Sequence, residues 1–129
     1  MIMTEIVYIA EPTEDSPKVQ LDSVSGVLMF SGTSITENSE EFYGPVLNWL
    51  DDFINMKPKS IEVNFKLDYF NTSSSKYILE ILRTIQRVSA TSKIVVKWHY
   101  LIDDDDMKEA GEDYQIMVKL PFEMVEYDD

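Results

Sequence analysis

The stretch from Ser60 to Val88 constrains the fold most, because its hydrophobic period changes from two residues to about 3.6. In its first part, apolar and polar residues alternate, which predicts a strand with one buried face. The apolar strand positions are Ile61, Val63, Phe65 and Leu67. In its second part, apolar residues recur at helical spacing, at Ile78, Ile81, Leu82, Ile85 and Val88. Between them, residues 71–75 are all polar, which predicts a five-residue turn leading into a helix N-terminus.

Four further segments have strand-like patterns. They are residues 6–10, 19–21, 27–30 and 94–101. Gly26 is expected to supply the positive φ of a hairpin turn between the second and third of them. Both middle strands are amphipathic, whereas strands covered on both faces would be almost continuously apolar. We therefore expect an α/β fold, a two-layer sandwich in which three helices cover mainly one face of a mixed sheet of about five strands. The tail, residues 122–127, is expected to add a short edge strand.

Two of the three helices have ambiguous starts. Asn38 with Glu41 forms a capping box for the first helix. Because a proline inside a helix removes a hydrogen bond, we expect a short first turn to end there and the main helix to begin at Pro45. The third helix is expected after a capping box that starts at Asp106, although Gly111 is unfavourable inside it.

Length and composition restrict the class of protein. A chain of 129 residues fits one domain, residues 1–129. The net charge of −13 argues against nucleic acids and anionic membranes as partners. Cysteine is absent, and neither a signal sequence nor a membrane span is evident, so we expect a cytoplasmic protein.

Neither a metal site nor a catalytic site is expected. The acidic run from Asp103 to Asp106 lacks the spacing of a calcium loop, and His99 is the only histidine. No nucleophile elbow, phosphate-binding loop or dinucleotide-binding motif is present. We therefore predict a protein that is not an enzyme and needs no cofactor. A hydrolase that uses the acidic run remains a further hypothesis.

Thr72 is the leading candidate for a functional residue. Hydroxyl residues at a helix start usually only cap the helix. A phosphate on Thr72 would instead lie beside free N–H groups and the positive end of the helix dipole, with Lys76 one turn away. Helical spacing also places three basic residues in one stripe, with Glu80 near its edge. The expected partner-binding residues are Asn71, Ser73, Ser74, Lys76, Glu80, Arg83 and Arg87.

The segment from Asn71 to Lys76 resembles the SiaC family of bacterial regulatory phosphoproteins. Three other stretches carry the same resemblance, which extends over about residues 32–125. They are residues 36–50 (Thr36-Glu-Asn-Ser39, Phe42-Tyr43-Gly-Pro45 and Trp49-Leu50), residues 97–100 (Lys97-Trp98-His-Tyr100), and residues 109–122 (Glu109-Ala-Gly-Glu112 and Leu120-Pro-Phe122).

The resemblance implies a fold like that of STAS domains, the anti-sigma-factor antagonists. It also implies that Thr72 is phosphorylated by a partner kinase and dephosphorylated by a PP2C-type phosphatase. The unphosphorylated form would bind and activate a diguanylate cyclase in cyclic-di-GMP and biofilm signalling, as a monomer or weak homodimer. An anti-sigma-factor antagonist that switches partners in a transcription pathway remains an alternative.

Overall fold

The computed structural model describes residues 6–129. Within these residues the chain forms six strands and three helices. In order they are β1 (Val7–Ala10), β2 (Lys18–Asp22), β3 (Val27–Ser34), α1 (Ser39–Asn55), β4 (Ser60–Phe70), α2 (Thr72–Gln86), β5 (Lys93–Leu101), α3 (Asp105–Met117) and β6 (Phe122–Tyr127). None of the helices in the described part of the chain is long and apolar enough to cross a membrane.

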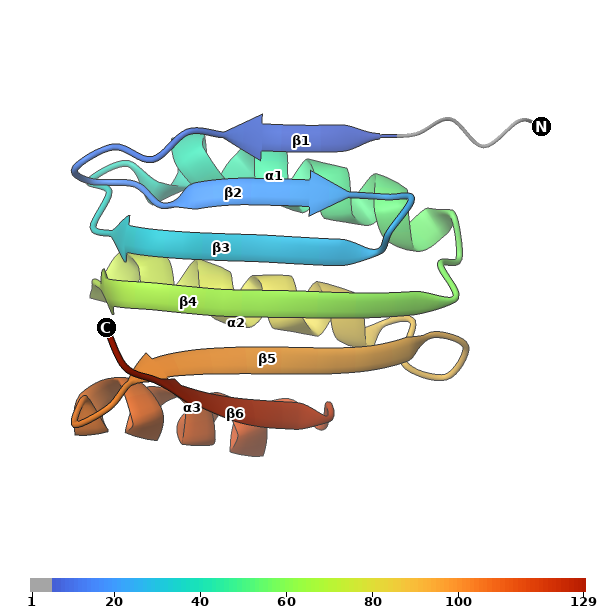
Figure 1. Ribbon diagram of the computed structural model, residues 1–129. Coiled ribbons are helices and arrows are strands. Elements are labelled where there is room, and N and C mark those ends of the chain that lie inside the picture. Colours follow the sequence, from blue (N-terminus) through green and yellow to red (C-terminus); the bar gives the residue numbers. More distant parts are fainter. Residues whose placement is uncertain (1–5) are drawn as a thin grey trace.

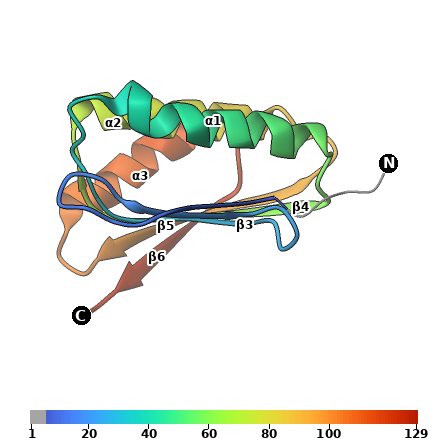
Figure 2. The ribbon, with the colours of Figure 1, turned by 90° about the horizontal axis from the view of Figure 1, so that it is seen from above.

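The strands lie in the sheet in the same order as in the sequence, β1 to β6 (Figure 1). The pairs β1–β2 and β2–β3 are antiparallel, and the other three pairs are parallel. All three helices cover one face of the sheet (Figure 2). The prediction of a two-layer α/β fold with a mixed sheet is therefore confirmed. The tail forms the sixth strand because residues 122–127 pair along the whole second half of β5.

Aromatic and branched apolar side chains fill the space between the sheet and the helices. The Phe30 and Phe65 rings stack with centroids 5.0 Å apart, and Trp98 packs against Phe65 from the next strand. Each of these side chains is at most 1% exposed. The alternation in β4 and β5 thus gives one buried face, as the period of two predicts.

Gly26 forms the turn between β2 and β3, as predicted. Its φ is +72°, and a Cβ atom there would lie 2.4 Å from the Ser60 carbonyl oxygen. Only glycine fits this position, because any side chain would meet the start of β4. The Gly26 carbonyl in turn accepts a hydrogen bond from Glu62 N. The hairpin is therefore attached directly to the central strand.

The pairing between β3 and β4 shifts by one residue near the end of both strands. Gly32 pairs with Leu67, whereas Thr33 pairs with Tyr69. Asp68 is therefore an extra, unpaired residue in β4, as in a β-bulge. After this residue, Phe70 lies on the helix-covered side of the sheet, where its ring packs edge-on against Trp98.

The predicted start of the main first helix at Pro45 is wrong. Asn38 is the N-cap, as expected, and its side chain accepts a hydrogen bond from Glu41 N. However, α1 continues from Ser39 through Pro45 without a break. A proline there deprives the Glu41 carbonyl of its helical partner. Glu41 and Pro45 are both exposed, so water can take the place of the missing donor.

The predicted N-cap of the third helix, Asp106, is also wrong. Asp104 is the cap, and its carboxylate accepts a hydrogen bond from Met107 N at 3.0 Å. Gly111 is accommodated because it faces the Trp98 ring, where a Cβ atom would approach to 2.3 Å. The Trp98 indole N–H donates to the Met107 carbonyl at 2.9 Å, which holds α3 against the sheet.

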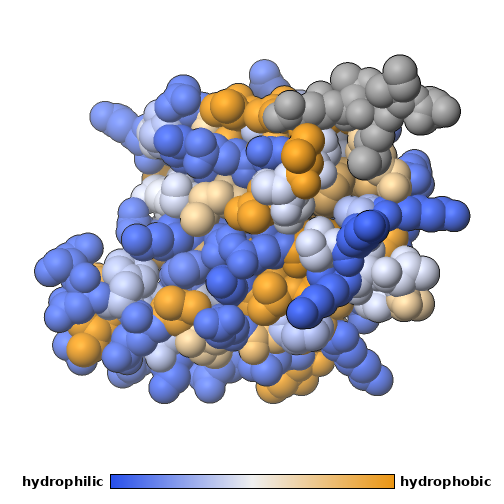
Figure 3. Space-filling view, turned by 45° about the vertical axis from the view of Figure 1, so that its right-hand side comes forward, coloured by the Kyte–Doolittle hydropathy of each residue, from blue (hydrophilic) through white to orange (hydrophobic). Residues whose placement is uncertain are grey.

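No helix formed by residues 6–129 covers the other face of the sheet, which carries a polar network. Lys97 Nζ lies 3.1 Å from Glu62 Oε1, and Asn64 Nδ2 donates to Glu62 Oε2 at 3.0 Å. His99 Nε2 lies 3.0 Å from Asn64 Oδ1. Figure 3, an oblique view of this side, shows a largely hydrophilic surface with separate apolar patches. Among the described residues, no group of acidic or histidine side chains could hold a metal ion.

Candidate functional site

The candidate site lies where the parallel strands end and the three helices begin (Figure 1). Only Asn71 stands between β4 and α2, so the predicted five-residue turn is wrong. Asn71 is the N-cap, and its Oδ1 accepts a hydrogen bond from Ser74 N at 2.9 Å. Because this single residue both ends the strand and caps the helix, Thr72 to Ser75 already form the first helical turn.

Thr72 is exposed at the first position of α2. Its backbone carbonyl accepts a hydrogen bond from Ser75 Oγ at 2.6 Å. The first N–H groups of a helix have no intrahelical acceptor, and together with the helix dipole they favour an anion. Thr72 is therefore an exposed residue at a helix end that favours an anion.

The neighbouring Ser73 is held by hydrogen bonds to the start of α1. Its Oγ lies 2.6 Å from Ser39 Oγ, which lies 2.8 Å from Thr36 Oγ1. Asn71 Nδ2 also donates to the Thr36 carbonyl at 3.3 Å. These contacts connect the first turns of α1 and α2, two segments more than thirty residues apart in sequence. They keep the backbone that presents Thr72 in one position.

Ser74 is fully buried, so its side chain is not available for direct contact with a partner. The Ser34 hydroxyl donates to Ser74 Oγ at 2.8 Å and also bonds with the Tyr43 hydroxyl. Burial raises the pKa of Tyr43, so its hydroxyl stays protonated. The interior position of Ser74 follows from its place four residues before Ile78, on the apolar stripe of the helix.

The predicted basic stripe is only partly free. Lys76 and Arg83 are exposed on α2, whereas Arg87 turns towards α1 and forms an ion pair with Asp51 at 3.1 Å. Both partners of this ion pair are more than half exposed, so it contributes little to stability. Glu80 is exposed on the same helix. Lys76, one turn after Thr72, is thus the cation best placed to respond to a phosphate.

Sequence reasoning missed the residues that support Thr72 from other elements. Ser34 belongs to β3, and Ser39 and Tyr43 belong to α1. Their contacts with α2 span 34 to 40 positions in the sequence, so no local pattern indicates them. A weak signal was the occurrence of hydroxyl residues at the starts of two successive predicted helices.

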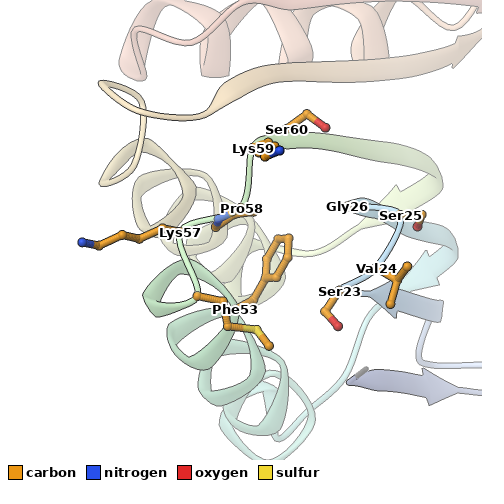
Figure 4. A pocket seen from close by; sticks show the side chains of 10 residues that line it. Ser23, Val24, Ser25, Gly26, Phe53, Lys57, Pro58, Lys59 and Ser60 are labelled. Atoms are coloured by element: carbon orange, nitrogen blue, oxygen red, sulfur yellow. The ribbon is translucent and has the colours of Figure 1, made fainter. Parts of the chain in front are cut away.

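A separate cavity of about 370 Å³ lies at the opposite end of the sheet, between the β2–β3 turn and the loop after α1. It contains none of the predicted site residues. In Figure 4 the Lys57 side chain points away from the Phe53 ring and from the Ser23–Gly26 turn. Lys59 also lines the cavity, which has no acidic or histidine side chain among the described residues that line it.

Comparison with known proteins gives a consistent result. Residues 10–127 match the model of the SiaC family regulatory phosphoproteins. An uncharacterised protein of Pseudomonas aeruginosa (strain UCBPP-PA14) is 30% identical over 118 residues, which cover 91% of this chain and 94% of that protein.

Solved structures agree with this match. The crystal structure of diguanylate cyclase SiaD in complex with its activator SiaC, from P. aeruginosa, contains a chain that is similar with a TM-score of 0.88 and 27% identity, covering 93% of this chain and 99% of that one. The apo-SiaC crystal structure from the same organism has a TM-score of 0.84 and 28% identity, covering 95% and 99%. The chain belongs to the SiaC family of regulatory phosphoproteins.

Proposed function

We propose that the chain is a phosphorylation-switched binding protein that acts on a diguanylate cyclase and has no catalytic activity of its own. Thr72 is the residue that a kinase phosphorylates and a PP2C-type phosphatase dephosphorylates. The similar SiaC chain occurs in a complex with a diguanylate cyclase, which favours this partner over an anti-sigma factor. The proposal places the chain in the cytoplasm, the compartment that supplies the nucleotide such a kinase needs.

The observation that carries the proposal is the contrast between Thr72 and its two neighbours. Thr72 is exposed, whereas Ser73 bonds to α1 and Ser74 is buried against β3. Of these three hydroxyls, that of Thr72 is the one a kinase can reach without disturbing the fold. The rigid contacts of the other two keep its position constant between the two phosphorylation states.

The switch is electrostatic and steric. A phosphate adds a charge of roughly −1.5 to −2 at the head of α2. If a partner covers Thr72, this charge must lose its water or the interface must open. Burying an unpaired charge costs several kcal/mol, and about 1.4 kcal/mol changes a dissociation constant tenfold. The unphosphorylated form is therefore the form that binds.

The test measures binding to diguanylate cyclases from the organism that carries this chain, by isothermal titration calorimetry. The variant Thr72→Ala should bind as the wild type does, and Thr72→Glu should bind at least about tenfold more weakly. Thr91→Glu is the matched control, because Thr91 is exposed in the turn between α2 and β5, beyond the other end of the helix. Equal binding of Thr72→Ala and Thr72→Glu to the cognate cyclase would refute the switch.

A further inference from the structure

A groove lies between α2 and α3 on the helix-covered side of the molecule. One cavity of about 290 Å³ includes Lys76 and Leu79 of α2 and Met117 of α3. A second, of about 190 Å³, continues it towards the end of β4. Both cavities share Phe70 and Ala110, so they form one depression. In Figure 2, α3 is inclined to α1 and α2.

The floor of the groove is apolar and firmly held. The Tyr114 hydroxyl donates to the Ser75 carbonyl at 2.8 Å and so joins α3 to the first turn of α2. Phe70 and Leu79 pack partly against the core. Met117, at the far end, is 52% exposed and has room for an apolar partner. An apolar surface that is accessible from outside is typical of a site where a partner docks.

The two walls of the groove carry opposite charges. On the α3 side, Asp106 and Asp113 are exposed, seven residues apart on one face of the helix. On the α2 side, Lys76 is exposed in the groove, and Arg83 follows seven residues later. A partner segment lying in the groove meets acids on one flank and bases on the other. This asymmetry determines both the chemistry and the orientation of the segment.

We propose that this groove receives an amphipathic helix of the diguanylate cyclase, with its basic flank towards α3 and its acidic flank towards α2. Both walls are helices and the groove has no free strand edge, so a helix fits better than an added strand. The depression is too open to enclose a small ligand. This inference rests on the proposed function and names the surface that performs it.

The groove also explains how Thr72 acts on the partner. Thr72 precedes Lys76 by four residues, so both lie on the same face of α2. A phosphate there would neutralise Lys76 and repel the acidic flank of the bound helix. The effect requires no change in the fold, because Thr72 is exposed and does not line the groove itself.

The first test uses charge reversal and the purified cyclase as the probe. Asp113→Lys should weaken binding about tenfold, whereas Glu112→Lys, which makes the same change in net charge on the exposed opposite side of α3, should alter it less than about twofold. Melting temperatures of both variants should match the wild type. If the wild type binds and Asp113→Lys binds equally well, the groove is refuted while the proposed function stands. A wild-type chain that binds no cyclase overturns both.

The second test identifies the occupant by photocrosslinking. A benzoylphenylalanine at Met117 should crosslink to a helical segment of the cyclase that has one basic and one acidic flank. The same residue at Gln115, which is exposed and outside the groove, should not. Crosslinking at Gln115 alone, to a second copy of this chain, or to a segment without that charge pattern would contradict the proposal. Mass spectrometry of the crosslinked peptides distinguishes these outcomes.

Discussion

The Ser34 hydroxyl donates a hydrogen bond to Ser74 Oγ at 2.8 Å, and both side chains are fully buried. This bond joins the end of β3 to the first turn of α2, across forty positions of sequence. Ser34 also bonds to the Tyr43 hydroxyl of α1. Thus β3, α1 and α2 meet at the buried Ser34 hydroxyl. These contacts fix the position of the first turn of α2, which carries Thr72.

Replacing Ser34 by alanine should lower the free energy of unfolding by about 1–3 kcal/mol, because Tyr43 and Ser74 would lose a buried partner. Urea denaturation monitored by circular dichroism measures this change. Ser75→Ala is the control, since the Ser75 hydroxyl bonds in an exposed setting and its loss should cost less than about 0.5 kcal/mol. Equal losses in the two variants would show that the buried contact has no special role.

Placing a negative charge at Thr72 should stabilise the isolated protein while it weakens partner binding. Thr72→Glu puts a carboxylate at the first position of α2, where the helix dipole favours it by about 0.3–1 kcal/mol at low salt. Thr72→Gln is the neutral control. Thermal unfolding at low and high ionic strength should show the difference and its screening. A destabilised Thr72→Glu variant would mean that its weaker binding reflects damage to the fold.

Two glycine substitutions should have opposite effects. Gly111→Ala should destabilise the protein by about 1–3 kcal/mol, because the new methyl group would overlap the Trp98 ring and displace α3. Gly44→Ala, in the interior of α1 where the new methyl group would meet no atom within 4 Å beyond its chain neighbours and the adjacent helix backbone, should stabilise it by about 0.5–1 kcal/mol. Chemical denaturation of both variants checks the signs. If Gly111→Ala is also stabilising, α3 is not fixed by its contact with Trp98.

Stability should fall as pH decreases through the range in which histidine titrates. Burial, and next the nearby Lys66 and Lys97, lower the pKa of His99 below its ordinary value of 6.5, against the opposing effect of Glu123 and Glu62. The unfolded chain therefore binds a proton at a higher pH than the folded chain. As a result, the stability associated with neutral His99 is complete above pH 6.5 and is lost progressively below it.

The variant His99→Gln should remove this part of the pH dependence. Unfolding free energies measured between neutral and mildly acidic pH would then change less than those of the wild type. A second decrease at lower pH should remain, because hydrogen bonds from Asn64 and Lys97 lower the pKa of Glu62. An unchanged slope near pH 6 in His99→Gln would show that other groups control the dependence.

The strands and helices with strong periodicity were predictable from the sequence. The alternation from Ile61 to Leu67 and the stripe from Ile78 to Ile85 correspond to β4 and α2, since burial of one face is a local property of such patterns. Predictions based on single residues were less successful. Pro45 lies inside α1 because its exposed position makes the lost hydrogen bond tolerable. Asp104, not Asp106, caps α3, and several adjacent aspartates gave no means of choosing between them.

The sequence predicted Thr72 as the central residue of the site, but it did not predict the residues of other elements that hold its neighbours in place. The position of Thr72 at the start of a helix followed from the polar residues before Ile78. The contact of Ser73 with Ser39, and that of Ser74 with Ser34, depend on how α1 and β3 are placed beside α2. Such contacts arise from the tertiary fold, and a single sequence carries no local record of them.

The unpaired Asp68 in β4 determines the rotation with which the chain enters α2. Side chains of a strand alternate between its two sides, so Leu67 and Phe70, three positions apart, both face the helices only because Asp68 and Tyr69 lie together on the other side. In a strand of the same length without the bulge, Tyr69 would take the helix-facing position and Phe70 would point away from it. Over the paired length β4 thus carries one residue more than β3, and this extra residue is accommodated before Thr72, so α2 begins with Phe70 held against the Trp98 ring.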